Sequence, residues 1–211
     1  MSAKTYLEEM YTAERNLRAA ETRLLELDDS TVVKALQAAV QEARAVEDPA
    51  ESGLRLERLS DLCAQVEGPE MVDSLLAILD AEDPAVRVAA GEALLDVGYE
   101  RYAEFARAVE RFLQGDGGPA LTELPWILAE IGEPSALKLI RLFLKQESTE
   151  VIAASIEALA QLGDPEAIAD LQQFVDDPRK VMMEDYEAET STTLGELAQA
   201  SIEELGGPLS T

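Results

Sequence analysis

The stretch Glu82-Asp-Pro-Ala-Val-Arg-Val-Ala-Ala-Gly-Glu-Ala-Leu-Leu-Asp-Val-Gly98 reads as one amphipathic helix with a defined start and end. Asp83 is a good N-cap, and Pro84 takes the first helical position, where its missing N–H costs nothing. Gly98 predicts a helix end in the left-handed conformation. Between them, apolar residues recur at spacings of three and four and form one stripe: Val86, Ala90, Leu94 and Val97.

This pattern returns three more times, so the helix belongs to a repeat. The copies align on Gly98, Gly132, Gly163 and Gly206, which are 34, 31 and 43 residues apart. The positions 1, 4, 8 and 12 residues before each glycine are apolar, except for Ser155. Each period also contains an earlier apolar helix, over residues 71–80, 99–113, 134–145 and 165–175. Repetition at roughly 20–50 residues predicts a solenoid, whose units bury their apolar faces against their neighbours.

The first copy resembles a known family. Asp83-Pro84-Ala-Val-Arg87, followed by Ala89-Ala90 and Ala93-Leu94, is similar to the HEAT repeat in its short bacterial form, which phycobilin lyases also contain. The resemblance covers about residues 69–206 and is sharpest in the first unit. It implies an all-α fold, an α-solenoid of helix–turn–helix repeats, in which the second helices line a concave surface.

Later copies depart from the family pattern at one position. The Asp and Arg pair survives only in the first unit, because Leu121 and Ile152 stand where the later arginines belong. This leaves open whether the Asp–Arg ladder of the family forms here.

The predicted organisation has four parts. Residues 1–46 form an N-terminal helical hairpin cap, and residues 47–68 a degenerate repeat helix. Four HEAT-like repeats follow over residues 69–206 (69–98, 99–132, 133–163 and 164–206), and residues 207–211 are a tail.

The first helix, 3–27, has a heptad pattern with Ala3, Met10, Leu17, Leu24 on one seam position and Tyr6, Ala13, Ala20, Leu27 on the other. We favour a cap that covers the first apolar face; a dimerisation arm is the alternative.

Charge and composition restrict the class of protein. The 211 residues include 43 acidic and 17 basic side chains, so the net charge is −26. Such a chain is repelled by nucleic-acid phosphates and anionic membranes, which argues against both as partners. No run of about 18 apolar residues predicts a membrane span, and no alternating β-branched run predicts a strand. These features predict a soluble cytoplasmic protein; its oligomeric state is open.

The usual catalytic groups are missing from the sequence. The chain has no histidine, which removes the commonest general base and imidazole metal sites. Its single cysteine, Cys63, lies in an apolar helix and is expected to be a buried small hydrophobe. No phosphate-binding glycine motif is present. We therefore predict a protein that is not an enzyme, with no catalytic residue, no cofactor and no metal site.

The one tryptophan is the strongest candidate for partner binding. Trp126 lies six residues before Gly132, in a column otherwise held by Glu92, Glu157 and Ala200. The resemblance implies that this column faces the concave surface, where Trp anchors concentrate binding energy. The alternative is that Pro125 kinks the helix and turns Trp126 inward. The acidic neighbours predicted around it are Glu92, Asp96, Glu123, Glu130, Glu157 and Glu204.

A long insertion, residues 176–193, offers a second candidate surface. Met182, Met183 and Tyr186 would make an adaptable apolar contact there. The alternative is a flap that covers the apolar edge of the last repeat. Thr192 or Thr193, with Glu196, predicts a capping box that restarts the helix.

Three functions compete. The favoured one is a non-catalytic scaffold or adaptor that binds a protein or peptide, with a basic surface, in the concave groove. The second is an acidic inhibitor, such as an immunity protein or nucleic-acid mimic, of a basic enzyme. The third is a subunit similar to the bilin lyases. Charge-driven binding should weaken steeply with salt, whereas a Trp-anchored contact should not.

Overall fold

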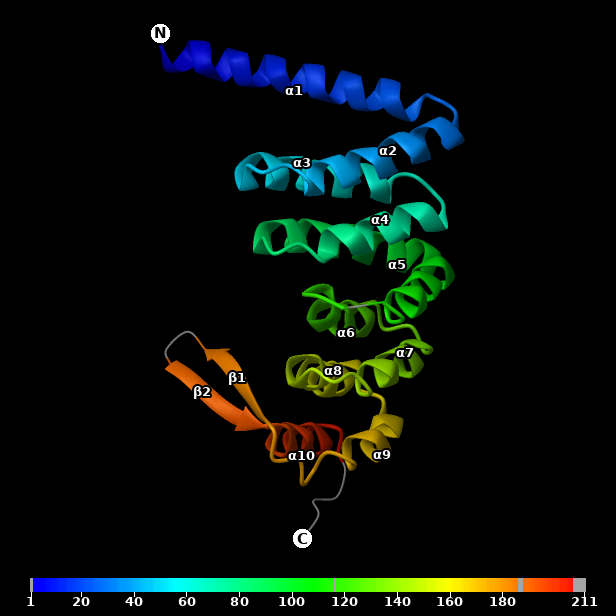
Figure 1. Ribbon diagram of the computed structural model, residues 1–211, viewed down its shortest axis with the longest axis vertical. Helices are drawn as coiled ribbons and strands as arrows, with labels where there is room; N and C mark the ends of the chain where they lie inside the picture. Colours follow the sequence, from blue (N-terminus) through cyan, green and yellow to red (C-terminus); the bar gives the residue numbers. More distant parts are fainter. Residues whose placement is uncertain (1, 116, 186–187, 207–211) are drawn as a thin grey trace.

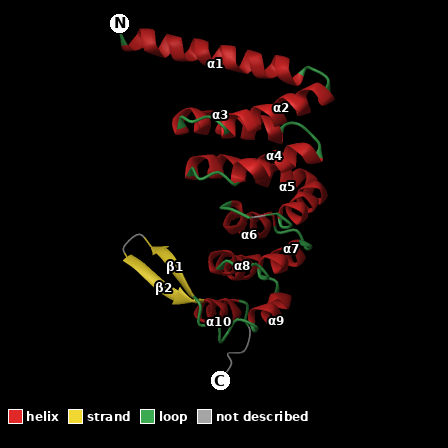
Figure 2. Ribbon diagram, viewed as in Figure 1, coloured by secondary structure: helices red, strands yellow, loops and turns green. Residues whose placement is uncertain are grey.

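The computed structural model describes residues 2–115, 117–185 and 188–206 and is a stack of helical layers (Figure 1). Almost all regular structure in these residues is α-helical, with one β-hairpin near the C-terminal end (Figure 2). The elements are α1 (Ala3–Leu25), α2 (Asp29–Arg44), α3 (Pro49–Ala64), α4 (Pro69–Leu79), α5 (Pro84–Phe112), α6 (Ala120–Ile131), α7 (Ala136–Phe143), α8 (Thr149–Leu162), α9 (Ile168–Leu171), β1 (Lys180–Asp185), β2 (Ala188–Thr193) and α10 (Leu194–Glu204).

Two columns of helices run along the molecule. The first helices of the layers, α2, α4, α7 and α9, form one column, and the second helices, α3, α6, α8 and α10, form the other. The long helix α5 belongs to both columns: its first part is a second helix and its last part is the first helix of the next layer. Successive second helices pack on each other, as α3 on α5, α5 on α6, α6 on α8 and α8 on α10. The predicted α-solenoid is confirmed.

Most helices begin as the sequence predicts. Asp48, Asp83 and Asp164 each precede a proline, and each side chain accepts a hydrogen bond from the backbone N–H two residues later, at 3.0, 2.9 and 2.9 Å. Helix α10 starts with the predicted capping box, in which Thr193 and Glu196 bond each other's backbone N–H groups. These caps satisfy donors that a helix cannot satisfy internally.

The aligned apolar columns form the core. The residues 4, 8 and 12 positions before each of the four glycines are buried in every repeat. Ser155 is the polar exception, and its hydroxyl donates to the Val151 carbonyl at 2.6 Å, which removes the cost of burying it. The earlier helices contribute the largest buried side chains, Phe105 and Phe143. Each layer is therefore held by apolar contacts with its neighbours.

The predicted helix end at Gly98 is wrong. Gly132, Gly163 and Gly206 have the left-handed backbone, with φ of 67°, 73° and 75°, but Gly98 does not. Helix α5 runs through Gly98 and bends at Arg101, where φ is −136° and ψ is 47°. Gly98 is instead buried, and an added Cβ would overlap Ile131 Cδ1 and lie 3.0 Å from Ile131 Cγ1. The first glycine of the series thus serves close packing, whereas the later ones end helices.

The expectation that no strand forms is also wrong. Part of the 176–193 insertion is an antiparallel hairpin in which Lys180 pairs with Thr193 and Asp185 with Ala188. Only Val181 is buried among the hairpin side chains that the structure describes. Because a single buried residue sets no alternating pattern, the strands left little trace in the sequence. The hairpin packs on α8 through β1 and on α10 through β2.

Helix α1 differs from the others because none of its residues is buried. It contacts α2 only weakly, and its N-terminal part extends beyond the end of α3 (Figure 1). The predicted division into a cap, a bridging unit and four repeats remains a prediction. Within the described residues, no helix is both long enough and apolar enough to cross a membrane.

Gly98 offers a test of close packing in α5. We expect Gly98→Ala to lower the free energy of unfolding by about 1–3 kcal/mol, because the new methyl group overpacks against Ile131. Urea denaturation with circular dichroism measures this change.

Gly91→Ala is the matched control on the same helix. Its added Cβ would lie 3.8 Å from the nearest side-chain atom, Ile127 Cδ1. Alanine favours a helix by about 0.5–1 kcal/mol over glycine, so this variant should be at least as stable as the parent. Equal stability of the two variants would contradict the packing explanation.

Candidate functional site: the acidic face of the second helices

Six side chains on α5, α6 and α8 define the surface that we call the acidic face: Glu92, Asp96, Glu123, Trp126, Glu130 and Glu157. Glu92, Asp96, Trp126 and Glu130 are exposed, while Glu123 and Glu157 are half-buried. None of the six is buried, so the column that the sequence predicted to face outward does so.

Trp126 is placed outward by the helix that carries it. Leu124 and Leu128 are fully buried on the core side of α6. Trp126 comes two residues after Leu124, which places it about 200° further round the helix. Its side chain is 37% exposed. Helix α6 continues through Pro125, which is itself buried, so the alternative in which Pro125 turns Trp126 inward does not hold.

Two of the carboxylates take part in contacts between layers. Arg87 Nε donates to Glu123 Oε1 at 3.2 Å, and Arg87 Nη1 donates to the carbonyls of Ala81 and Glu82 at 3.1 and 2.9 Å. The surviving family arginine therefore bonds its own turn and the next second helix, while Asp83 caps α5. Further along, Gln161 Nε2 donates to Glu130 Oε2 at 3.3 Å. Glu123 is thus partly neutralised by a cation, whereas no cation among the described residues pairs with Glu130.

Glu157 is the carboxylate that the fold affects most. It lies on α8 next to residues that are buried almost all round the helix. Loss of water around the carboxylate raises the pKa of Glu157 above its ordinary value of 4.5. No salt bridge among the described residues involves it. The charge is therefore held at this position at some cost to the fold.

Glu92 and Asp96 also line a hollow of about 680 Å³ between α1, α3 and α5. Six carboxylates surround this hollow, against two guanidinium groups, those of Arg58 and Arg101. Arg101 is occupied, since it donates to the carbonyls of Ala64 and Val66 at 3.1 and 3.4 Å. The acidic face therefore continues into a hollow with a net negative lining.

The structure describes the side chain of only one of the three contact residues predicted in the hairpin. Met182 is exposed on β1. The Met183 side chain and Tyr186 lie outside the residues whose placement the structure describes. In Figure 2 the hairpin stands beside α8 and α10, at the C-terminal end of the column of second helices.

The sequence analysis missed two apolar residues of this surface. Val88 and Tyr99 on α5 are exposed, and the Tyr99 hydroxyl donates to the Glu130 carbonyl at 3.2 Å. Val88 stands ten residues before Gly98, in the column that holds Thr122 in the next repeat. A β-branched apolar residue in an outward column was the pattern that could have revealed it.

Cys63 is not suited to act as a reactive thiol. Its side chain is fully buried, and burial raises the pKa of the thiol to about 12. The thiolate form that reacts with electrophiles is therefore rare at neutral pH.

Comparison with known proteins supports the repeat assignment. Residues 123–185 match the family model described as HEAT repeats. This match falls on the later repeats rather than on residues 82–98, where the motif is sharpest. No curated protein matches the chain.

Several solved structures are similar over most of the chain. One is an engineered protein from a structural genomics consortium, with 17% identity, a TM-score of 0.40, and coverage of 91% of this chain and 98% of that one. Another is a computationally designed armadillo repeat protein for modular peptide recognition, with 14% identity, a TM-score of 0.37, and coverage of 90% and 93%. A third is a designed armadillo repeat protein in complex with the peptide (KR)4, with 16% identity, a TM-score of 0.40, and coverage of 91% and 94%.

The column pattern and the stacked helix pairs show that the chain is an α-helical solenoid, and residues 123–185 of it match HEAT repeats.

Proposed function

We propose that this protein is a non-catalytic scaffold whose acidic face binds a peptide or protein segment with basic residues. Trp126 anchors the segment, and the surrounding carboxylates select its charge. The observation that carries the proposal is the position of Trp126, exposed between carboxylates on a surface built from rigid helices.

The distribution of exposed apolar side chains supports this surface over the opposite one. Among the described residues, the large apolar side chains that are exposed fall into two groups. One is at the N-terminal end of the solenoid: Tyr6, Leu7, Met10, Tyr11, Leu27 and Leu54. The other lies along the acidic face and its hairpin: Val88, Tyr99, Trp126 and Met182. None lies on α2, α4, α7 or α9, so the column of first helices offers no comparable contact surface.

Charge supports the basic character of the partner. Glu92, Asp96 and Glu130 are exposed, and no salt bridge among the described residues neutralises them. A cationic segment that covers Trp126 would place its Lys or Arg side chains beside these carboxylates. Complementary charge speeds association and excludes acidic competitors, while an aromatic anchor in a partly desolvated position supplies affinity.

Trp126 is both the predicted anchor and the only tryptophan, so it reports on its own contact. Titration with an alternating Lys-Arg octapeptide should shift its emission to shorter wavelength as the indole leaves water. With a fluorescein-labelled peptide, Trp126→Ala should weaken binding about 10- to 30-fold in anisotropy, whereas Trp126→Phe should keep most of it.

Lys138→Ala is the control. Lys138 is exposed on α7, in the column of first helices, so its substitution should leave peptide binding unchanged. The measurement is repeated at about 0.05 and 0.3 M salt, where screening differs strongly. If Trp126→Ala binds like the parent and binding disappears in salt, the anchor is wrong, and the acidic inhibitor or nucleic-acid mimic is the better description. Absence of peptide binding at low salt would overturn the proposal.

Glu157 links binding to stability. Its pKa is raised in the folded state, so the folded protein holds a proton more tightly than the unfolded chain. Stability therefore falls as pH rises from the unfolded value near 4.5 through the raised folded value, and the penalty is complete above it. We expect Glu157→Gln to raise the thermal midpoint at pH 7 and to lose this advantage below pH 4.5, while it weakens binding of the basic peptide.

Glu150→Gln is the matched control on the same helix, with the opposite sign. The Ser148 hydroxyl donates to Glu150 at 2.7 Å and lowers the pKa of that carboxyl. Its substitution should remove a small stabilisation at pH 7 and leave peptide binding unchanged. A lower thermal midpoint for Glu157→Gln at pH 7 would contradict the desolvation of Glu157.

A further inference from the structure

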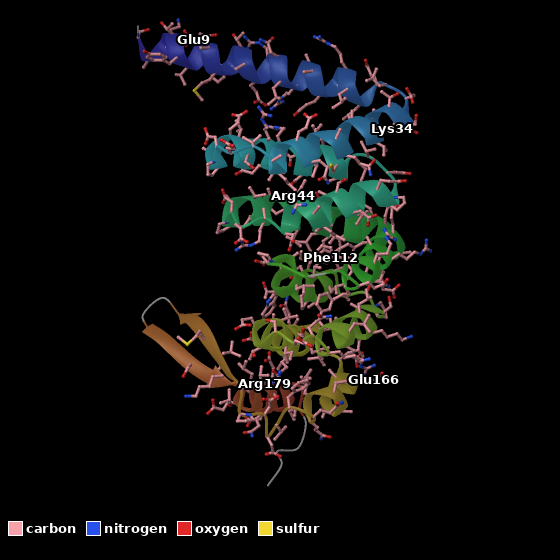
Figure 3. All side chains as sticks on the ribbon, in the orientation of Figure 1. Glu9, Lys34, Arg44, Phe112, Glu166 and Arg179 are labelled. Atoms are coloured by element: carbon pink, nitrogen blue, oxygen red, sulfur yellow. The ribbon has the colours of Figure 1, made fainter. Side chains whose placement is uncertain are left out.

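Helix α1 presents an apolar stripe that its own chain does not cover. Tyr6, Leu7, Met10 and Tyr11 are all exposed, Met10 to 64%. They lie on the N-terminal half of α1, which carries Glu9 and extends clear of the other helices (Figure 3). Burial of apolar side chains is favourable because it removes apolar area from water, so four together on one helix half form a contact surface.

A hollow that could accept such a helix lies at the same end of the solenoid, between α1, α2 and α3. An open hollow of about 460 Å³ separates the C-terminal half of α1 from α2 and α3. Its apolar lining comes from Leu17, Ala39, Leu54 and Leu59, and Leu54 is exposed in this position although it is a large aliphatic residue. Arg55 and Arg58 line the hollow together with one acid, Glu42. Both also form ion pairs beside it, Arg55 with Glu51 and Arg58 with Glu21 and Asp61.

The charges of α1 fit an antiparallel partner of the same sequence. Residues 3–14 carry one lysine and three glutamates, a net of −2, and residues 15–25 carry three arginines and one glutamate, a net of +2. The helix is therefore neutral overall in a chain whose net charge is −26. Two copies of such a chain repel each other over most of their surface, and α1 is a long element where they can meet without that repulsion.

We propose that two copies of this protein associate through α1, in antiparallel orientation. The acidic N-terminal half of each α1 docks into the hollow of the other copy, where it contacts the basic C-terminal half of the partner helix. Its apolar residues cover Leu17 and Leu54 of that hollow. The contact is isologous, so it occurs twice and closes the dimer. The heptad spacing of α1 suits helix-to-helix packing of this kind.

The proposed apolar contact is tested by placing one charged side chain in it. Sedimentation velocity of the full chain between about 1 and 100 μM should show a monomer–dimer equilibrium. Met10→Glu should weaken the dimer at least tenfold with unchanged helical circular dichroism, because it places a carboxylate in the apolar contact. Lys138→Glu is the control: Lys138 is exposed on α7, several layers from α1 (Figure 1), so its dimer should match the parent.

The orientation is tested by mixing two charge-reversal variants. Glu8→Lys/Glu9→Lys makes both halves of α1 basic, and Arg15→Glu/Arg18→Glu makes both halves acidic. Each variant alone should be monomeric, and their equimolar mixture should form a heterodimer. A parent chain that stays monomeric at 100 μM, a dimer that survives Met10→Glu, or a mixture that stays monomeric would each overturn the proposal. In the first case α1 is free for a different partner.

Discussion

Every layer of this molecule depends on the burial of one apolar stripe against the layers before and after it. The stripe residues of the second helices are buried in each repeat, and no layer contains a core of its own. Such an arrangement leaves two ends whose outer faces have no neighbour. The C-terminal end is modified by the hairpin, which buries Val181 and packs along α8 and α10. The N-terminal end carries α1, which leaves its own stripe exposed.

Polar contacts between neighbouring layers fix how the layers align along the stack. Arg111 bonds Asp73 at 2.7 Å and Arg141 bonds Asp170 at 2.6 Å, both between first helices. On the other column, Arg87 bonds Glu123. Each pair joins residues about one repeat apart, so it forms only when the layers are stacked in the right order. Exposed ion pairs add little stability, and their contribution here is to the alignment of neighbouring layers.

The sequence predicted those features that depend on periodic burial. The buried columns follow from spacing, because helix geometry fixes which residues share a face. For Trp126 the sequence left an outward and an inward position open, and the structure shows its side chain exposed. Gly98 was misread because a glycine chosen for close approach to Ile131 and a glycine chosen for a left-handed backbone look alike in sequence. The hairpin was missed because Val181 is its one buried side chain among those described. The desolvation of Glu157 depends on neighbours from other elements, which no local pattern records.

The uninterrupted course of α5 makes the array mechanically uneven. Where Gly132 and Gly163 end a helix, consecutive helices are joined by a short turn whose dihedrals can adjust. Between residues 84 and 112 the joint is a hydrogen-bonded helix with a single bend, fixed at Arg101 by bonds to the end of α3. Bending there requires these bonds to break, so the first two repeats resist deformation together. The acidic face therefore rests on one continuous helix on its α5 side and on helices joined by short turns on its α6 and α8 side, and a segment bound across Trp126 would contact both kinds of support.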